Sequence, residues 1–95
     1  RIPCTPEQRD TLLSLIRRSV EQNGEFLGET VEAMETLDGV RVELPGGFCL
    51  IRGSNTEPCL TLRSEAANAT ALMQRDEALV AYVTERLKTI TAITA

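Results

Sequence analysis

The sequence predicts a two-layer α+β domain, in which an antiparallel sheet of about four strands packs against two helices. Three observations indicate this fold class. Apolar residues recur at helical spacing near both ends of the chain, the middle alternates between apolar and polar residues, and turns containing glycine or proline separate the middle runs. The expected order is helix, strands, helix, in a single domain that spans residues 1–95.

The first helix is expected to begin within "CTPEQ", residues 4–8. Thr5 and Gln8 match a capping box, and Pro6 suits the first helical position because an N–H there would have no intrahelical partner. Gly24 is the expected left-handed residue that ends the helix. The apolar side chains between them follow helical spacing: Leu12, Leu13, Ile16 and Val20.

Four strands are expected in the middle of the chain, over residues 30–37, 40–44, 48–52 and 59–66. Asp38-Gly39 has the composition of a two-residue hairpin turn, and "PGG" at 45–47 is expected to form the next turn. The clearest alternation is in "VRVEL", which places three residues on one face of the sheet: Val40, Val42 and Leu44.

The second helix can be capped by Asn68 or Thr70. The apolar stripe that follows has a period near 3.6 residues and is expected to face the core rather than a cofactor. Its members are Leu72, Met73, Leu79, Val80, Val83, Leu87 and Ile90. The last segment, "TITAITA", is expected to be a frayed terminus or a short remnant.

Charge and composition exclude several classes of function. The net charge is −4 and the isoelectric point is about 4.8, which argues against a general nucleic-acid-binding protein. No run of about 18 apolar residues is present, so no membrane-spanning helix is expected. Three cysteines without a CxxC motif or a signal peptide favour a cytoplasmic location, with Cys49 and Cys59 as small buried hydrophobic residues.

Metal-dependent and histidine-dependent chemistry have little support. The chain contains no histidine, and no second cluster of ligands accompanies its acidic stretch. We therefore expect that stretch to be a solvated surface: Glu25, Glu29, Glu32 and Glu35.

The segment "RGSNTEP", residues 52–58, joins two predicted strands and is longer than a tight hairpin requires. Its donors suit an oxyanion: a guanidinium, two hydroxyls, an amide, and a glycine that admits backbone N–H groups. These belong to Arg52, Ser54, Thr56, Asn55 and Gly53. Glu57 would repel a phosphate, so we expect it to orient Arg52 or to accept backbone N–H bonds. From composition alone, a polar turn that satisfies its own backbone is the favoured interpretation.

The longer segment "LDGVRVELPGGFCLIRGSNTEPCLTLRSEA", residues 37–66, resembles the C-terminal, fourth domain of the α-D-phosphohexomutases, of the phosphomannomutase/phosphoglucomutase type. In that family the loop closes over the active-site cleft and grips the sugar phosphate that is not being transferred. The resemblance implies that Arg52, Ser54, Asn55 and Thr56 contact this phosphate and that Gly53 gives access to the backbone. Asn55 favours the phosphomannomutase/phosphoglucomutase type, since glucosamine-type mutases usually have glycine there.

The resemblance also implies the partners of the domain. These are the other domains of a parent enzyme and hexose phosphates, namely glucose or mannose 1-phosphate, 6-phosphate and 1,6-bisphosphate. The family's phosphoserine and Mg²⁺ loops have no match here, so both are expected in the parent's other domains, and the fragment is expected to bind no cofactor and to catalyse no phosphoryl transfer. The alternative is a non-catalytic α+β domain for protein interaction or regulation, with no sugar-phosphate binding.

Overall fold

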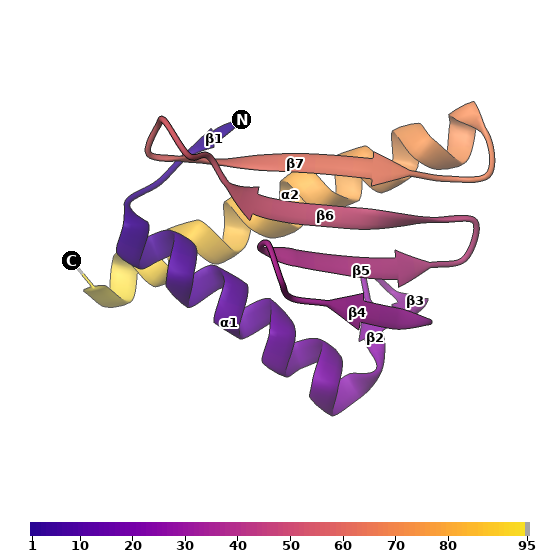
Figure 1. Cartoon of the computed structure of the whole chain (residues 1–95), viewed down its shortest axis with the longest axis horizontal. Helices are drawn as coiled ribbons and strands as arrows, with labels where there is room; N and C mark the ends of the chain where they lie inside the picture. The colour runs from indigo at the N-terminus through magenta and orange to yellow at the C-terminus, as the bar shows by residue number, and fades with distance from the viewer. Residues whose placement is uncertain (95) are drawn as a thin grey trace.

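The computed structural model describes residues 1–94, with side chains up to residue 91, and contains two helices and two sheets (Figure 1). The elements are, in chain order, β1 (Ile2–Pro3), α1 (Pro6–Asn23), β2 (Glu25–Phe26), β3 (Glu29–Thr30), β4 (Ala33–Glu35), β5 (Val40–Leu44), β6 (Gly47–Gly53), β7 (Cys59–Glu65) and α2 (Ala69–Thr94).

The larger sheet has the strand order β1-β7-β6-β5-β4, and all its neighbours are antiparallel. Both helices pack on one face of this sheet, with α1 against β5 and β6 and α2 against β7 and α1 (Figure 1). The predicted two-layer α+β class and the order helix, strands, helix are therefore confirmed.

Helix α1 begins and ends as its sequence predicts. The Thr5 hydroxyl accepts a hydrogen bond from the N–H of Gln8 at 3.1 Å, and the Gln8 side chain accepts one from the N–H of Thr5 at 2.8 Å. Gly24 has a φ of 68° and donates its N–H to the carbonyl of Val20. Local sequence therefore fixes both ends of this helix.

The core lies between the sheet and the helices and is built from the predicted faces. Val40, Val42 and Leu44 are buried, as the alternation in β5 requires. The helical side chains that meet them are Leu12, Ile16 and Val20 from α1 and Leu79, Val83, Leu87 and Ile90 from α2. The cysteines Cys4, Cys49 and Cys59 are unpaired and buried, which confirms the expectation for the last two.

Several predicted boundaries are wrong in the first half of the sheet. The strand expected over 30–37 is only β4, and a four-residue connection, 36–39, replaces the two-residue hairpin expected at Asp38-Gly39. A second sheet, formed by β2 and β3, was not predicted. Its strands have two residues each, too few to show an alternating pattern.

Helix α2 also differs from its prediction. Asn68, one of the two expected caps, accepts a hydrogen bond from the N–H of Ala71 at 2.8 Å. Met73 and Val80 are exposed, because they lie beside the buried stripe rather than within it. The segment expected to fray continues the helix to Thr94, and Ala95 lies outside the described residues.

A buried arginine joins four parts of the fold. Arg75 of α2, whose side chain is 6% exposed, donates to both carboxylate oxygens of Glu29, at 2.9 and 3.2 Å. It also donates to the carbonyl of Pro45, at 2.9 Å, and to the carbonyl of Glu65. Glu29 is thus an ion-pair partner and not the freely solvated residue that the acidic stretch suggested. We call this group the Arg75 anchor.

The Arg75→Met variant tests the anchor. The variant keeps an apolar stem but leaves two carbonyl groups without their donor, so we expect the free energy of unfolding to fall by about 2–4 kcal/mol. The control is Arg86→Met, because Arg86 lies on the same helix and stacks on Tyr82, 4.6 Å from the ring centre. Urea unfolding measures both, and equal losses would refute the role assigned to the anchor.

A second stability test compares two glycines, to distinguish the cost of steric overlap from the cost of a left-handed backbone. Gly28 and Gly39 both have a φ of 76°, but a Cβ at position 28 meets nothing within 4 Å. A Cβ at position 39 overlaps the carbonyl oxygen of Ile51 and lies 2.8 Å from the Cα of Arg52. We expect Gly28→Ala to lower the free energy of unfolding by about 1 kcal/mol and Gly39→Ala by about 2–5 kcal/mol. Similar values from urea unfolding would contradict the steric argument.

Candidate phosphate-binding site

The loop between β6 and β7 is closed by main-chain bonds within the "RGSNTEP" segment and at its end. The N–H of Ser54 donates to the carbonyl of Cys59 at 3.0 Å, and the N–H of Cys59 donates to the carbonyl of Glu57 at 2.8 Å. The Ser54 hydroxyl accepts a longer bond, 3.4 Å, from the N–H of Thr56. Ser54 is half-buried, while Asn55, Thr56 and Glu57 are exposed. The loop therefore holds a defined shape and presents polar side chains at its surface.

Arg52 stands at the base of this loop, as the second-last residue of β6 before the chain leaves the sheet. In the β6–β7 pairing it lies opposite Thr61, and its side chain is 40% exposed. Its Nη1 lies 3.4 Å from Oδ2 of Asp38, in the connection between β4 and β5. Gly39 gives the backbone of that connection its close approach to Arg52. The structure thus brings residues 36–39 to the candidate site.

One of the two roles expected for Glu57 was to orient Arg52, but its carboxylate pairs with a different arginine. Its carboxylate forms an ion pair of 3.1 Å with Arg1, and Asp38 takes the place beside Arg52. The reason is that β1 pairs with the start of β7, so the N-terminal residue lies next to the loop. This neighbour is distant in sequence, and no local pattern could indicate it.

The N-terminal segment is attached to the loop at a second point. The N–H of Cys4 donates to the carbonyl of Pro58 at 2.9 Å. Burial raises the pKa of the Cys4 thiol, and the nearby charge of Arg9 partly opposes this effect. Because the pKa lies above its ordinary value, the thiol is neutral near pH 7. Cys4 therefore acts here as a packed apolar residue beside the loop.

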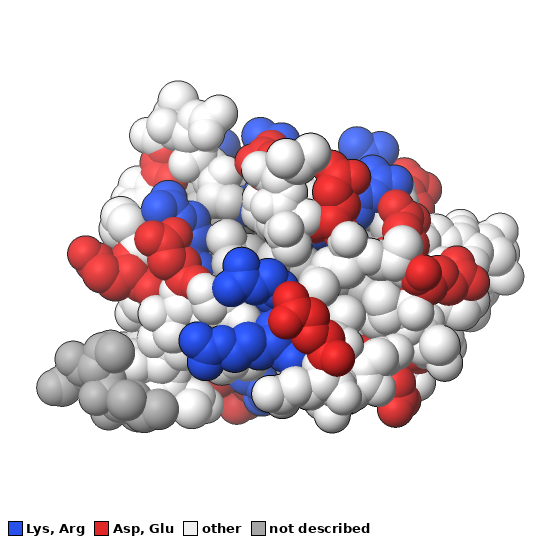
Figure 2. Space-filling model, turned by 60° about the horizontal axis from the view of Figure 1, so that its bottom comes forward, with Lys and Arg blue, Asp and Glu red and all other residues white. Residues whose placement is uncertain are grey.

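The face of the molecule shown in Figure 2 has no broad region of one charge over its described part. Figure 2 shows Lys and Arg interspersed with Asp and Glu over the described part of this face. The exposed ion pairs agree with this mixture: Arg17 with Glu21 at 3.9 Å and Arg9 with Asp10 at 3.0 Å. A phosphate site in this chain must therefore depend on a few local arginines rather than on a general positive field.

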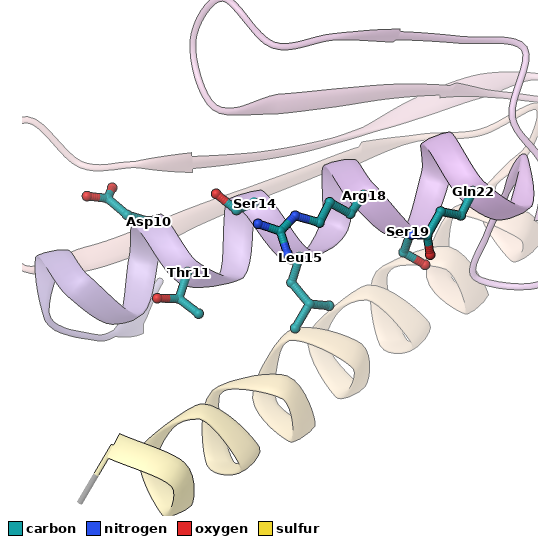
Figure 3. Close-up of a pocket in the computed structure, with 7 residues that line it drawn as sticks. All are labelled: Asp10, Thr11, Ser14, Leu15, Arg18, Ser19 and Gln22. Atoms are coloured by element: carbon teal, nitrogen blue, oxygen red, sulfur yellow. The ribbon is translucent and has the colours of Figure 1, made fainter.

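A large hollow runs along the outer side of α1. It has a volume of about 660 Å³ and is bordered by side chains of that helix alone, including Thr11, Ser14 and Arg18 (Figure 3). A functional pocket usually gathers groups from several elements, and this open furrow does not. The loop therefore remains the better candidate for a binding site.

The described residues give no sign of a metal site or a membrane segment. Among residues 1–94 no three acidic or cysteine side chains gather closely enough to hold a metal ion. No helix in that range has the length and apolar character needed to cross a membrane.

Comparison with known proteins identifies the family of this chain. Residues 11–81 match the family described as phosphoglucomutase/phosphomannomutase, C-terminal domain. The chain belongs to this family. It is 43% identical over 68 residues to the phosphoglucosamine mutase of Methanocaldococcus jannaschii, a match that covers 72% of this chain and 14% of that protein.

Two further relatives carry related names. The phosphoglucomutase of Neisseria gonorrhoeae is 52% identical over 48 residues, which is 50% of this chain and 10% of that protein. The phosphomannomutase/phosphoglucomutase of Pseudomonas aeruginosa is 64% identical over 31 residues, 33% of this chain and 7% of that protein. The chain thus spans a small part of the length of the curated mutases it matches.

The structure of this mutase-family domain brings together all the residues that the motif predicted. These five residues are consecutive: Arg52 and Gly53 end β6, and Ser54, Asn55 and Thr56 begin the loop. Sequence reasoning missed three neighbours of the loop: Arg1, Arg9 and Asp38. Strand pairing brings Arg1 and Asp38 there, and the packing of α1 on the sheet brings Arg9.

Proposed function

We propose that this chain is the fourth, C-terminal domain of a four-domain phosphohexomutase, and that its loop binds the substrate phosphate that is not being transferred. In this proposal Arg52, Ser54, Asn55 and Thr56 contact the phosphate. Gly53 lets backbone N–H groups approach the phosphate, and Glu57 holds the loop to the N-terminal segment. Membership of the mutase family supports the parent's class, an isomerase that moves a phosphate between two positions of a hexose.

The observation that carries the proposal is the position of Arg52. Its guanidinium stands 40% exposed at the base of a loop whose main chain is tied at Ser54, Cys59 and Pro58. A loop fixed in this way loses little freedom on binding, which favours affinity. The planar fork of arginine can donate two hydrogen bonds to a phosphate, and the neighbouring hydroxyl and amide groups can donate more.

Binding by charge suits the reaction of such a mutase. A hexose 1,6-bisphosphate must turn over within the cleft, so that each phosphate in turn occupies the non-reacting position. A loop that grips phosphate and makes few contacts to the ring accepts either orientation. Closure of the domain over the sugar also excludes water, which would otherwise accept the phosphoryl group.

The phosphoryl transfer itself belongs, in this proposal, to other domains of the parent. Those domains would supply the phosphoserine and the Mg²⁺ that stabilises negative charge on the transferring group. The ligands would be glucose or mannose 1-phosphate, 6-phosphate and 1,6-bisphosphate. The alternative of a protein-interaction domain without sugar-phosphate binding is not favoured by the family match.

The first test is an amide NMR titration of this chain with glucose 1-phosphate, glucose 1,6-bisphosphate and sulfate. We expect saturable shifts that centre on residues 52–57. Arg52→Ala should weaken binding about tenfold, since a partly exposed charged hydrogen-bond donor is lost. Arg63→Ala removes the same charge from the same sheet, where Arg63 pairs with Glu65 at 3.3 Å, and should leave the affinity within about twofold.

Scattered or absent shifts at tens of millimolar ligand would overturn the claim that the chain holds a preformed phosphate site. Equal effects of the two arginine variants would overturn the role of Arg52, because then only general charge would matter.

The second test is kinetic and uses the complete parent enzyme. Arg52→Ala should raise KM and lower kcat/KM by a factor equivalent to about 2–4 kcal/mol, because contacts to the held phosphate are lost in both the ground and the transition states. Steady-state assays with hexose 1-phosphate measure this change. An Arg52→Ala enzyme with the kinetics of the wild type would contradict the proposal.

A further inference from the structure

The candidate loop has a second arginine beside it, which comes from α1. Arg9 lies in the second turn of that helix, and its side chain crosses the backbone of Gly53. A Cβ at position 53 would lie 2.5 Å from Cδ of Arg9 and 3.4 Å from both its Nε and its Nη1. The guanidinium therefore lies against the backbone from which the loop begins.

The contact with Arg9 explains why residue 53 is a glycine, and an unusual backbone conformation does not. The described residues with positive φ include four glycines, and Gly53 is not among them. A residue with a side chain could adopt the same backbone conformation, but it would collide with Arg9. The missing side chain thus provides the space that the arginine occupies.

Arg9 and Arg52 approach the start of the loop from opposite sides. Successive residues of a strand point to opposite faces, and Arg52 lies on the face away from the core. Position 53 faces the helices, which is the side from which Arg9 arrives. Figure 1 shows the start of α1, the end of β6 and the loop at the same end of the molecule. Both arginines therefore stand at the start of the loop, one on each side of the backbone of β6.

The carboxylates beside these arginines are more exposed than the arginines themselves. Asp10, which binds Nε of Arg9 at 3.0 Å, is 69% exposed, and Asp38, which faces Arg52, is 77% exposed. The two arginine side chains are 33% and 40% exposed. Ion pairs with such exposed partners are weak, so a phosphate dianion can compete for the guanidinium groups.

We propose that Arg9 is a second phosphate-binding arginine, whose guanidinium reaches the ligand through the space left by Gly53. The inference rests on the proposed function of the loop. Its ligand is the phosphate dianion of a hexose phosphate, for which two guanidinium groups supply matching charge. Nε remains bound to Asp10, and the terminal nitrogens of Arg9 donate to the phosphate.

The test is an NMR titration of this chain with glucose 1-phosphate, with chloride at equal ionic strength as the blank. Arg9→Gln keeps much of the length of the side chain and removes its charge, and it should raise the dissociation constant about five- to tenfold. Arg9→Lys keeps the charge and should recover part of the affinity. The matched control is Arg18→Gln, on the same helix and about 13 Å further along its axis, which should change the affinity less than about twofold.

Gly53→Ala provides an independent test through a double-mutant cycle. The added methyl should displace Arg9 and weaken binding about as much as Arg9→Gln does. In the Arg9→Gln background, Gly53→Ala should cause almost no further loss of affinity, because the guanidinium that the methyl would displace is already absent.

Two results would overturn the inference. One is an equal affinity of the Arg9→Gln and Arg18→Gln chains, and the other is an undiminished effect of Gly53→Ala in the Arg9→Gln background. Arg52→Ala separates this inference from the proposed function. If Arg52→Ala abolishes binding while Arg9→Gln does not weaken it, only the role of Arg9 fails. If neither variant weakens binding, the phosphate site itself is refuted.

Discussion

The hydrogen bonds of one buried arginine join four separate parts of the fold. The Arg75 anchor joins α2 to the β2–β3 sheet through Glu29, to the turn between β5 and β6 through Pro45, and to the end of β7 through Glu65. A buried guanidinium is costly unless its donors are satisfied, so these partners must all be in place together. In Figure 1 they meet at one end of the molecule, and the candidate loop lies at the other end.

This separation has a consequence for function. The anchored end fixes the pairing of β5, β6 and β7, and these strands run the length of the sheet to the opposite end. Because the register there is fixed, Arg52 must point away from the core and Gly53 must point toward α1. A one-residue slip would exchange the two positions, bury the charge of Arg52 and close the space over which Arg9 lies. The anchor therefore positions the loop without touching it.

The parts of the fold that sequence could predict are those set by neighbours along the chain. The capping box of Thr5 and Gln8, the left-handed Gly24 and the alternation in β5 each depend on a few consecutive residues. The β2–β3 sheet could not be predicted, because two-residue strands show no period and Leu27 adopts a φ of 53° without any local signal. Nothing in the sequence singled out Arg75, since its partners lie 10 to 46 positions away.

The same distinction applies to the candidate site. The motif named the residues of the loop, since they are consecutive, but not the groups that surround them. Two glycines illustrate the difference. Gly39 could be predicted as a turn residue, yet its tight contact with the backbone of Ile51 and Arg52 follows from the pairing of β5 with β6. Gly53 seemed to be needed for access to the backbone.

In the structure Gly53 also makes room for a side chain 44 positions earlier in the chain. A motif therefore specifies which residues are present in a loop, while the strand pairing decides what each of them does. For this reason the N-terminal segment, which carries none of the motif, contributes to the surroundings of the loop through Arg1, Cys4 and Arg9. The phosphate-binding unit that we propose is accordingly a property of three segments of the chain and not of the seven-residue motif alone.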